Sequence, residues 1–216
     1  MISKVIAAFL FTMSVFFLSM ASLAYYKLHN IKPKISEPAH YGSIVRLVRD
    51  DRTFCSGTVV NETTVLTAGH CMLIPTILGE TVNTEPIEIR AKDDISRKTF
   101  GRINTMSPQM DWAVLKGNFK IYNYRTVITD VETLNNKRDK TAEFISCGYP
   151  MAGNLFCTPV HYLYREDFMW AVEGLLLPGM SGGPVIDSEG NVIAINHAVH
   201  NEHSIVSPTY NLDKEF

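Results

Sequence analysis

Histidine, aspartate and serine occur in three short motifs whose residue types suit nucleophilic catalysis. The motifs span residues 67–71 (Thr-Ala-Gly-His-Cys), 111–115 (Asp-Trp-Ala-Val-Leu) and 179–184 (Gly-Met-Ser-Gly-Gly-Pro). A serine hydroxyl is a weak nucleophile at neutral pH until an imidazole takes its proton, and the imidazole needs a carboxylate to fix its tautomer. The sequence therefore predicts Ser181 as a nucleophile, His70 as its base and Asp111 as the carboxylate that orients the base.

Short segments rich in Val, Ile, Leu and Thr must position these motifs. They recur between turn residues at 43–49, 53–60, 63–68, 144–147, 158–164, 185–187 and 192–196. Helical periodicity is missing after residue 26. Many short strands at this spacing predict an all-β fold, either a sandwich or a pair of small barrels.

The charge of the chain is nearly balanced. Its 216 residues carry 20 basic and 22 acidic side chains, a formal net charge of −2. Proteins that bind nucleic acid or a polyanionic substrate usually carry a basic excess, so this composition predicts no nucleic-acid partner.

The N-terminal segment has the order of an export signal. Lys4 precedes an uncharged, apolar stretch at residues 5–26. Residues 1–24 are thus either a cleaved signal peptide or a retained signal anchor, which would attach the chain to a membrane through residues 5–26. The Lys- and Pro-containing residues 25–40 predict a linker, and residues 41–216 a folded domain.

The cysteines indicate an oxidising compartment. The chain has four, none in a Cys-x-x-Cys pair: Cys55, Cys71, Cys147 and Cys157. In a chain with an export signal, two disulfides are a better interpretation than metal ligands. We expect an exported protein, periplasmic or secreted.

Together the three motifs resemble those of the chymotrypsin-like (trypsin-fold) serine peptidases, which carry their histidine, aspartate and serine in this order. The resemblance spans roughly residues 41–200. It implies two six-stranded antiparallel β-barrels, which would follow an N-terminal hydrophobic helix formed by the export segment. It also implies a serine endopeptidase that hydrolyses a protein or peptide substrate through an acyl-enzyme, with His70, Asp111 and Ser181 as the triad.

The resemblance assigns further roles. The backbone N–H groups of Gly179 and Ser181 would form the oxyanion hole. A disulfide that many family members share would join Cys55 to Cys71 and hold His70 in place. Of the three pairings that four cysteines allow, this one leaves Cys147 to face Cys157 across a hairpin.

The sequence departs from trypsin in its activation signals. Trypsin has an aspartate immediately before the catalytic serine, where this chain has Met180, and no Ile-Val-Gly-Gly start occurs. The chain is more similar to the bacterial glutamyl endopeptidases and the protease domains of the high-temperature-requirement type. Only 35 residues follow Ser181, so no PDZ domain is expected after it.

Four residues are predicted to form the substrate pocket by their distance from the serine: Leu175, Asn196, His197 and Ala198. Because Leu175 is not acidic, we expect cleavage after an apolar or polar uncharged side chain. Alternatively, His197 points into the pocket and favours an acidic or amide side chain.

The histidines at 197, 200 and 203 do not predict a metal site, since this spacing in a strand places neighbours on opposite faces. We expect no metal and no cofactor. A rival interpretation of the whole chain is a catalytically silent trypsin-fold binding module of an exported or membrane-tethered protein, because fold alone does not fix function.

Overall fold

The computed structural model describes residues 42–91, 98–137, 143–151, 153–200 and 203–212. All of them belong to the compact unit Ile35–Phe216. The predicted export segment, residues 1–24, and the linker, residues 25–40, lie outside the described residues. Among the helices that the structure describes, none is long and apolar enough to cross a membrane.

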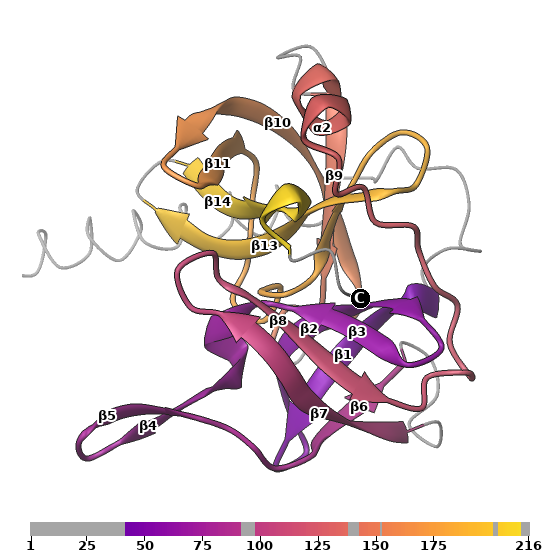
Figure 1. The fold of residues 1–216 in the computed structure, drawn as a ribbon, viewed down its shortest axis with the longest axis vertical. Coiled ribbons are helices and arrows are strands. Elements are labelled where there is room, and N and C mark those ends of the chain that lie inside the picture. The colour runs from indigo at the N-terminus through magenta and orange to yellow at the C-terminus, as the bar shows by residue number, and fades with distance from the viewer. Residues whose placement is uncertain (1–41, 92–97, 138–142, 152, 201–202, 213–216) are drawn as a thin grey trace, which may run out of the picture. The chain divides into compact units, whose positions relative to one another are not determined.

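Six antiparallel strands form the first closed barrel, in the order β1-β2-β3-β8-β7-β6. Figure 1 shows it in indigo to magenta. Its strands are β1 (Ile44–Arg49), β2 (Arg52–Asn61), β3 (Thr64–Thr67), β6 (Ile87–Arg90), β7 (Lys98–Ser107) and β8 (Trp112–Gly117). Strand β3 and the first four residues of β8 are fully buried. The sequence motifs around His70 and Asp111 therefore adjoin fully buried strands of this barrel.

Six more strands close the second barrel, in the order β10-β11-β14-β13-β12-β9. In Figure 1 it runs from orange to yellow. Its strands are β9 (Glu143–Gly148), β10 (Phe156–Glu166), β11 (Met169–Glu173), β12 (Pro184–Ile186), β13 (Val192–His200) and β14 (His203–Pro208). Ser181 lies in the connection between β11 and β12. The two barrels confirm the fold class that the resemblance implied.

Five smaller elements lie outside the two barrels, and the sequence predicted none of them. Strands β4 (Leu73–Thr76) and β5 (Gly79–Val82) form a separate two-stranded hairpin. One short α-helix, α2 (Val131–Lys137), and two 3₁₀ helices, η2 (Gly69–Met72) and η3 (Thr209–Asn211), complete the described elements. Elements of three to seven residues are too short for hydrophobic periodicity to reveal.

Two disulfides join the cysteines in the expected pairs. Cys55 in β2 is bonded to Cys71 in η2, the residue after His70. Cys147 in β9 is bonded to Cys157 in β10, and the two are direct partners in the strand ladder. One disulfide therefore reinforces a β-ladder, whereas the other holds the short helix that carries His70.

Candidate active site

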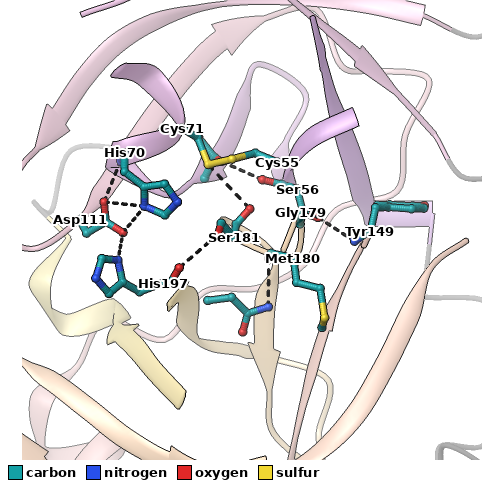
Figure 2. The surroundings of a disulfide bond; sticks show 12 residues. Cys55, Ser56, His70, Cys71, Asp111, Tyr149, Gly179, Met180, Ser181 and His197 are labelled. Atoms are coloured by element: carbon teal, nitrogen blue, oxygen red, sulfur yellow. Dashed lines mark hydrogen bonds and ion pairs between the residues drawn. A yellow bond between two sulfur atoms is a disulfide. The ribbon is translucent and has the colours of Figure 1, made fainter. Parts of the chain in front are cut away.

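The three predicted catalytic residues come together from three elements (Figure 2). His70 lies in η2, directly after β3. Asp111 precedes β8 and has a positive φ of 47°, a backbone conformation that costs energy in any residue but glycine. Because β3 pairs with β8, with Thr67 opposite Ala113, the ladder brings His70 and Asp111 side by side.

The carboxylate of Asp111 is the centre of the site. Its Oδ1 accepts a hydrogen bond of 2.7 Å from the backbone N–H of His70. Its Oδ2 faces the Nδ1 atom of His70 at 2.9 Å and also contacts Nδ1 of His197. Figure 2 shows the carboxylate between the two imidazole rings. An ionised carboxylate only accepts hydrogen bonds, so each imidazole carries its proton on Nδ1.

The environment of Asp111 favours its charged form. Burial alone would raise its pKa, but hydrogen bonds from His197 and His70, together with their charges, outweigh burial and lower the pKa from 3.8 to about 2. The side chain of Asp111 is only 7% exposed. A buried, ionised carboxylate is what an imidazole needs to hold its tautomer and to stabilise its protonated form.

Ser181 makes a hydrogen bond through its backbone carbonyl and a longer one through its hydroxyl. Its carbonyl accepts a 2.7 Å hydrogen bond from the N–H of Ser56. Its Oγ donates to the carbonyl of His197 at 3.1 Å. No hydrogen bond joins this hydroxyl to His70 within the described part of the chain, although both residues line the same cavity. Catalytic hydrogen bonds often tighten only when substrate binds.

The loop before Ser181 has its carbonyl groups anchored on neighbouring segments. Met151 N–H donates to the carbonyl of Pro178 at 2.9 Å, and the hydroxyl of Ser56 donates to that of Gly179 at 2.8 Å. The carbonyl of Met180 accepts from Gly183 N–H at 2.9 Å. None of the described peptide bonds is cis, and in a trans peptide the N–H and the C=O point in opposite directions. The N–H of Gly179 shares a peptide with the carbonyl of Pro178, and the N–H of Ser181 shares one with the carbonyl of Met180. Both N–H groups therefore point away from the donors that bind these two carbonyls.

Glycine is required at 179 and 182. Gly179 has a φ of +96°, and a Cβ there would lie 2.5 Å from the carbonyl oxygen of Tyr149. Gly182 has a φ of +83°, and a Cβ there would lie 2.2 Å from Oγ1 of Thr67. Both positions thus combine a left-handed backbone with a close approach that any side chain would prevent.

Asn196 does not line the cavity. Its side chain is fully buried, and it accepts a hydrogen bond from Ser146 at 2.7 Å. Its amide donates to the carbonyls of Cys147 at 2.9 Å and Met180 at 3.3 Å. The residue therefore supports the serine loop from inside the barrel, a role that the sequence analysis missed. The only signal was a polar side chain within an apolar strand.

A cavity of about 330 Å³ opens beside Ser181. Two of the predicted pocket residues, His197 and Ala198, line it, whereas Leu175 does not. The remaining lining residues are His70, Leu176, Leu177, Pro178, Ser181 and Val199. The wall is mainly aliphatic, and none of the described residues that form it is acidic.

Two groups of described residues bring three metal-ligating atoms within 4.8 Å of one another. One contains Cys55, Cys71 and His70, but its cysteines are joined in a disulfide and are not free to ligate. The other consists of His70, Asp111 and His197. His203, from the histidine series noted in the sequence, instead faces Glu166, with 3.5 Å between Nε2 and the carboxylate.

Several solved structures share this fold. The Rv3671c protease from M. tuberculosis in its active form has a TM-score of 0.59 and 17% identity, with 82% of this chain and 88% of that chain covered. The serine endoprotease from Yersinia pestis has a TM-score of 0.63 and 16% identity, with 82% and 64% covered. The HtrA-type protease AlgW with tripeptide has a TM-score of 0.61 and 20% identity, with 78% and 57% covered.

Identities this low show a common fold alone, and no curated protein sequence matches the chain. A family model provides the stronger comparison. The model of the trypsin-like peptidase domain matches residues 55–195, which is more than half of the chain and contains all three candidate catalytic residues. The chain therefore belongs to the trypsin-like peptidase domain family.

Proposed function

We propose that the protein is a serine endopeptidase that uses Ser181, His70 and Asp111 and passes through an acyl-enzyme. The observation that carries the proposal is that Ser181 and His70 line one cavity while Asp111 holds Nδ1 of His70 at 2.9 Å. With its proton on Nδ1, the imidazole of His70 has a free lone pair on Nε2. That nitrogen is the one that can act as a base.

The chemistry then follows from the positions of the protons. The hydroxyl of Ser181 turns from the carbonyl of His197 toward Nε2 of His70 and gives it the proton as Oγ attacks the peptide carbonyl. The N–H groups of Gly179 and Ser181 stabilise the oxyanion. The imidazolium passes the proton to the leaving amine, and water then releases the acyl group by the same route in reverse.

The substrate would bind along an open strand edge. Strand β13 pairs with β14 through residues 194–200, but its pairing with β12 ends at Ile195. No described strand pairs with residues 197–199 on the β12 side, so an extended peptide can add there as a further strand. The aliphatic cavity next to this edge favours an apolar side chain before the cleaved bond.

Activity without a freed N-terminus is part of the proposal. Met180 cannot form an ion pair, and it is fully buried. The amide of Asn196 and the N–H of Gly183 hold its carbonyl instead. Neutral hydrogen bonds from within the barrel thus take the place of an ion pair, and the loop needs no new N-terminus to order it.

The two disulfides support a proposed location in an oxidising compartment, periplasmic or extracellular. Residues 5–26 would direct export and, if retained, would attach the protein to the membrane. In either case the active site would face exported or extracellular proteins as substrates.

One observation favours the second candidate function, a binding module without turnover. The hydroxyl of Ser181 bonds to a carbonyl and not to His70. If this arrangement persisted with substrate, the serine would not be activated and the site would only bind peptides along β13.

Labelling of the full-length oxidised chain with a fluorophosphonate probe tests the proposal. We expect labelling of the wild type that Ser181→Ala and His70→Ala abolish. Matched controls are Ser188→Ala, in an exposed turn, and His161→Gln, on β10, both of which should label normally. A folded wild type that resists labelling would support the binding module.

A further inference from the structure

His197 gives the site a second imidazole that the triad mechanism does not use. Its Nδ1 points at the same oxygen, Oδ2 of Asp111, as Nδ1 of His70. The two rings meet edge to face, with centroids 5.5 Å apart. Figure 2 shows the two rings on either side of the carboxylate. Two nitrogens and one carboxylate oxygen therefore converge on one point.

This set of donor atoms suits zinc. Two imidazole nitrogens and a carboxylate oxygen, with a fourth position open, are a common coordination for Zn²⁺. In a tetrahedral site, ligand atoms about 2.1 Å from the metal lie about 3.4 Å from one another. The three atoms here all lie within 4.8 Å of one another, and His70 Nδ1 is 2.9 Å from Asp111 Oδ2. The contact between His70 Nδ1 and Asp111 Oδ2 would widen from 2.9 Å to about 3.4 Å around a bound ion.

The site is both accessible and supported. The side chains of His70 and His197 are 40% and 32% exposed, so an ion can reach them from the cavity they line. Asp111 is buried and stays oriented through Oδ1, which accepts the backbone N–H of His70. Oδ2 can thus exchange its contacts with the two imidazoles for a bond to the ion, while Oδ1 keeps the carboxylate in its orientation.

We propose that His70, Asp111 and His197 form an inhibitory site for Zn²⁺ that reversibly switches off the active site. The switch rests on the proposed function, because it acts by disabling the catalytic base.

Coordination disables His70 through its tautomer. Zinc requires the lone pair of Nδ1, so the proton of a neutral imidazole moves to Nε2. Nε2 is then a donor and cannot accept the proton of Ser181. The neutral ring keeps its single proton, and the fourth zinc position is left to water. Zinc therefore blocks the base without a covalent step.

Calorimetric titration with ZnCl₂ tests the site independently of activity. It uses the full-length Ser181→Ala protein, because Ser181 supplies none of the three ligand atoms. We expect one Zn²⁺ per chain, displaced by a chelator, and no binding of Mg²⁺, which prefers oxygen ligands. Adding His197→Gln should weaken zinc binding by more than about tenfold. Adding His161→Gln, which changes a histidine outside the cluster, should leave it unchanged.

Equal zinc affinity with and without His197→Gln would identify an adventitious ion and overturn the proposal, as would no binding at all. In the functional arm, ZnCl₂ should slow fluorophosphonate labelling of the wild type, and a chelator should restore it. Labelling that zinc leaves unaffected would refute the switch. A wild type that does not label even without zinc would count against the proposed peptidase, while the calorimetry still decides whether the zinc site exists.

Discussion

The hydroxyl of Ser181 and the backbone carbonyl of His197 lie 3.1 Å apart and share a hydrogen bond. The proton of the nucleophile thus points at β13, the strand along which the peptide is proposed to bind. A substrate that occupies this edge would compete for the carbonyl of His197 and release the hydroxyl toward His70. Under the proposed function, the substrate itself would therefore free the hydroxyl of Ser181 for attack.

The carboxylate of Asp111 should be essential for rate but not for folding. Asp111→Asn keeps the size of the side chain but presents an amide N–H as well as an oxygen, so His70 loses its fixed tautomer. In the family's known triads such a change lowers the rate by about 10⁴-fold. We expect a loss of this order in fluorophosphonate labelling. Asp50→Asn, at an exposed turn, should label at the wild-type rate, and equal rates for both variants would refute the role of Asp111.

The same carboxylate makes the free energy of unfolding depend on pH. Its pKa is about 2 in the folded chain, below the ordinary 3.8, so its contribution to stability is present above about pH 4 and disappears as the pH falls through 2. The shift corresponds to about 2 kcal/mol of unfolding free energy. Urea unfolding between pH 5 and pH 2 should show this loss in the wild type, beyond that in Asp111→Asn. Parallel curves for the two proteins would contradict the prediction.

Gly179, in the loop before Ser181, and Gly190, in the turn between β12 and β13, form a matched pair of glycines. Gly179→Ala forces a left-handed backbone on alanine and drives its Cβ into the carbonyl of Tyr149, so the N–H of residue 179 should turn away from the cavity. Loss of one such donor costs about 10²–10³-fold in kcat.

Gly190→Ala is the control for that variant. Gly190 also has a positive φ, +88°, but a Cβ there approaches nothing closer than 3.4 Å. Both variants should lose about 1–3 kcal/mol of stability from backbone strain. Only Gly179→Ala should lose activity, measured by the labelling rate of folded protein. If Gly190→Ala slowed labelling as much, strain alone would explain the effect.

Asn196 should matter for stability and for the serine loop together. Asn196→Leu leaves the carbonyl of Cys147 without its amide donor, removes one of two donors from Met180, and deprives Ser146 of its acceptor. A buried polar group that is left unpaired costs about 1–3 kcal/mol. Chemical denaturation should show a loss within that range or above it, together with slower labelling. Asn118→Leu, at an exposed position, should change neither.

The sequence was sufficient for the order of the motifs and for seven of the twelve barrel strands, because period-two patterns and turn residues act locally. The strands observed around residues 44–67 and at β9, β10, β12 and β13 match the expected segments closely. It missed the barrel strands β6, β7, β8, β11 and β14, which only the family resemblance implied, and also the short elements whose conformation depends on tertiary contacts. Helix α2 is an example, since its Leu134 is fully buried in the core of the second barrel.

The misplacement of Asn196 has a specific physical cause. Alternation along a strand assigns faces only while the register holds, and the pairing of β13 with β14 shifts between Asn196 and Ala198. A bulge of this kind re-aims the extra residue. It leaves Asn196 facing the core and brings His197 to Asp111. The sequence has no mark for the bulge, so the second imidazole at the carboxylate could not be predicted from spacing.

The two disulfides should separate stability from activity. They close loops of 16 and 10 residues, so in the chain-entropy model each contributes about 3 kcal/mol. The double variant Cys147→Ser with Cys157→Ser leaves both residues in a continuous ladder between β9 and β10. The double variant Cys55→Ser with Cys71→Ser instead releases η2, a single turn in which the N–H of Cys71 donates to the carbonyl of Ala68 at 3.3 Å.

Denaturant midpoints should therefore fall by similar amounts in both double variants. Labelling at Ser181 should slow mainly in the Cys55→Ser, Cys71→Ser protein, because the helix that carries His70 is no longer held. Equal labelling rates in the two double variants would show that the contact between His70 and Asp111 is sufficient to position the imidazole.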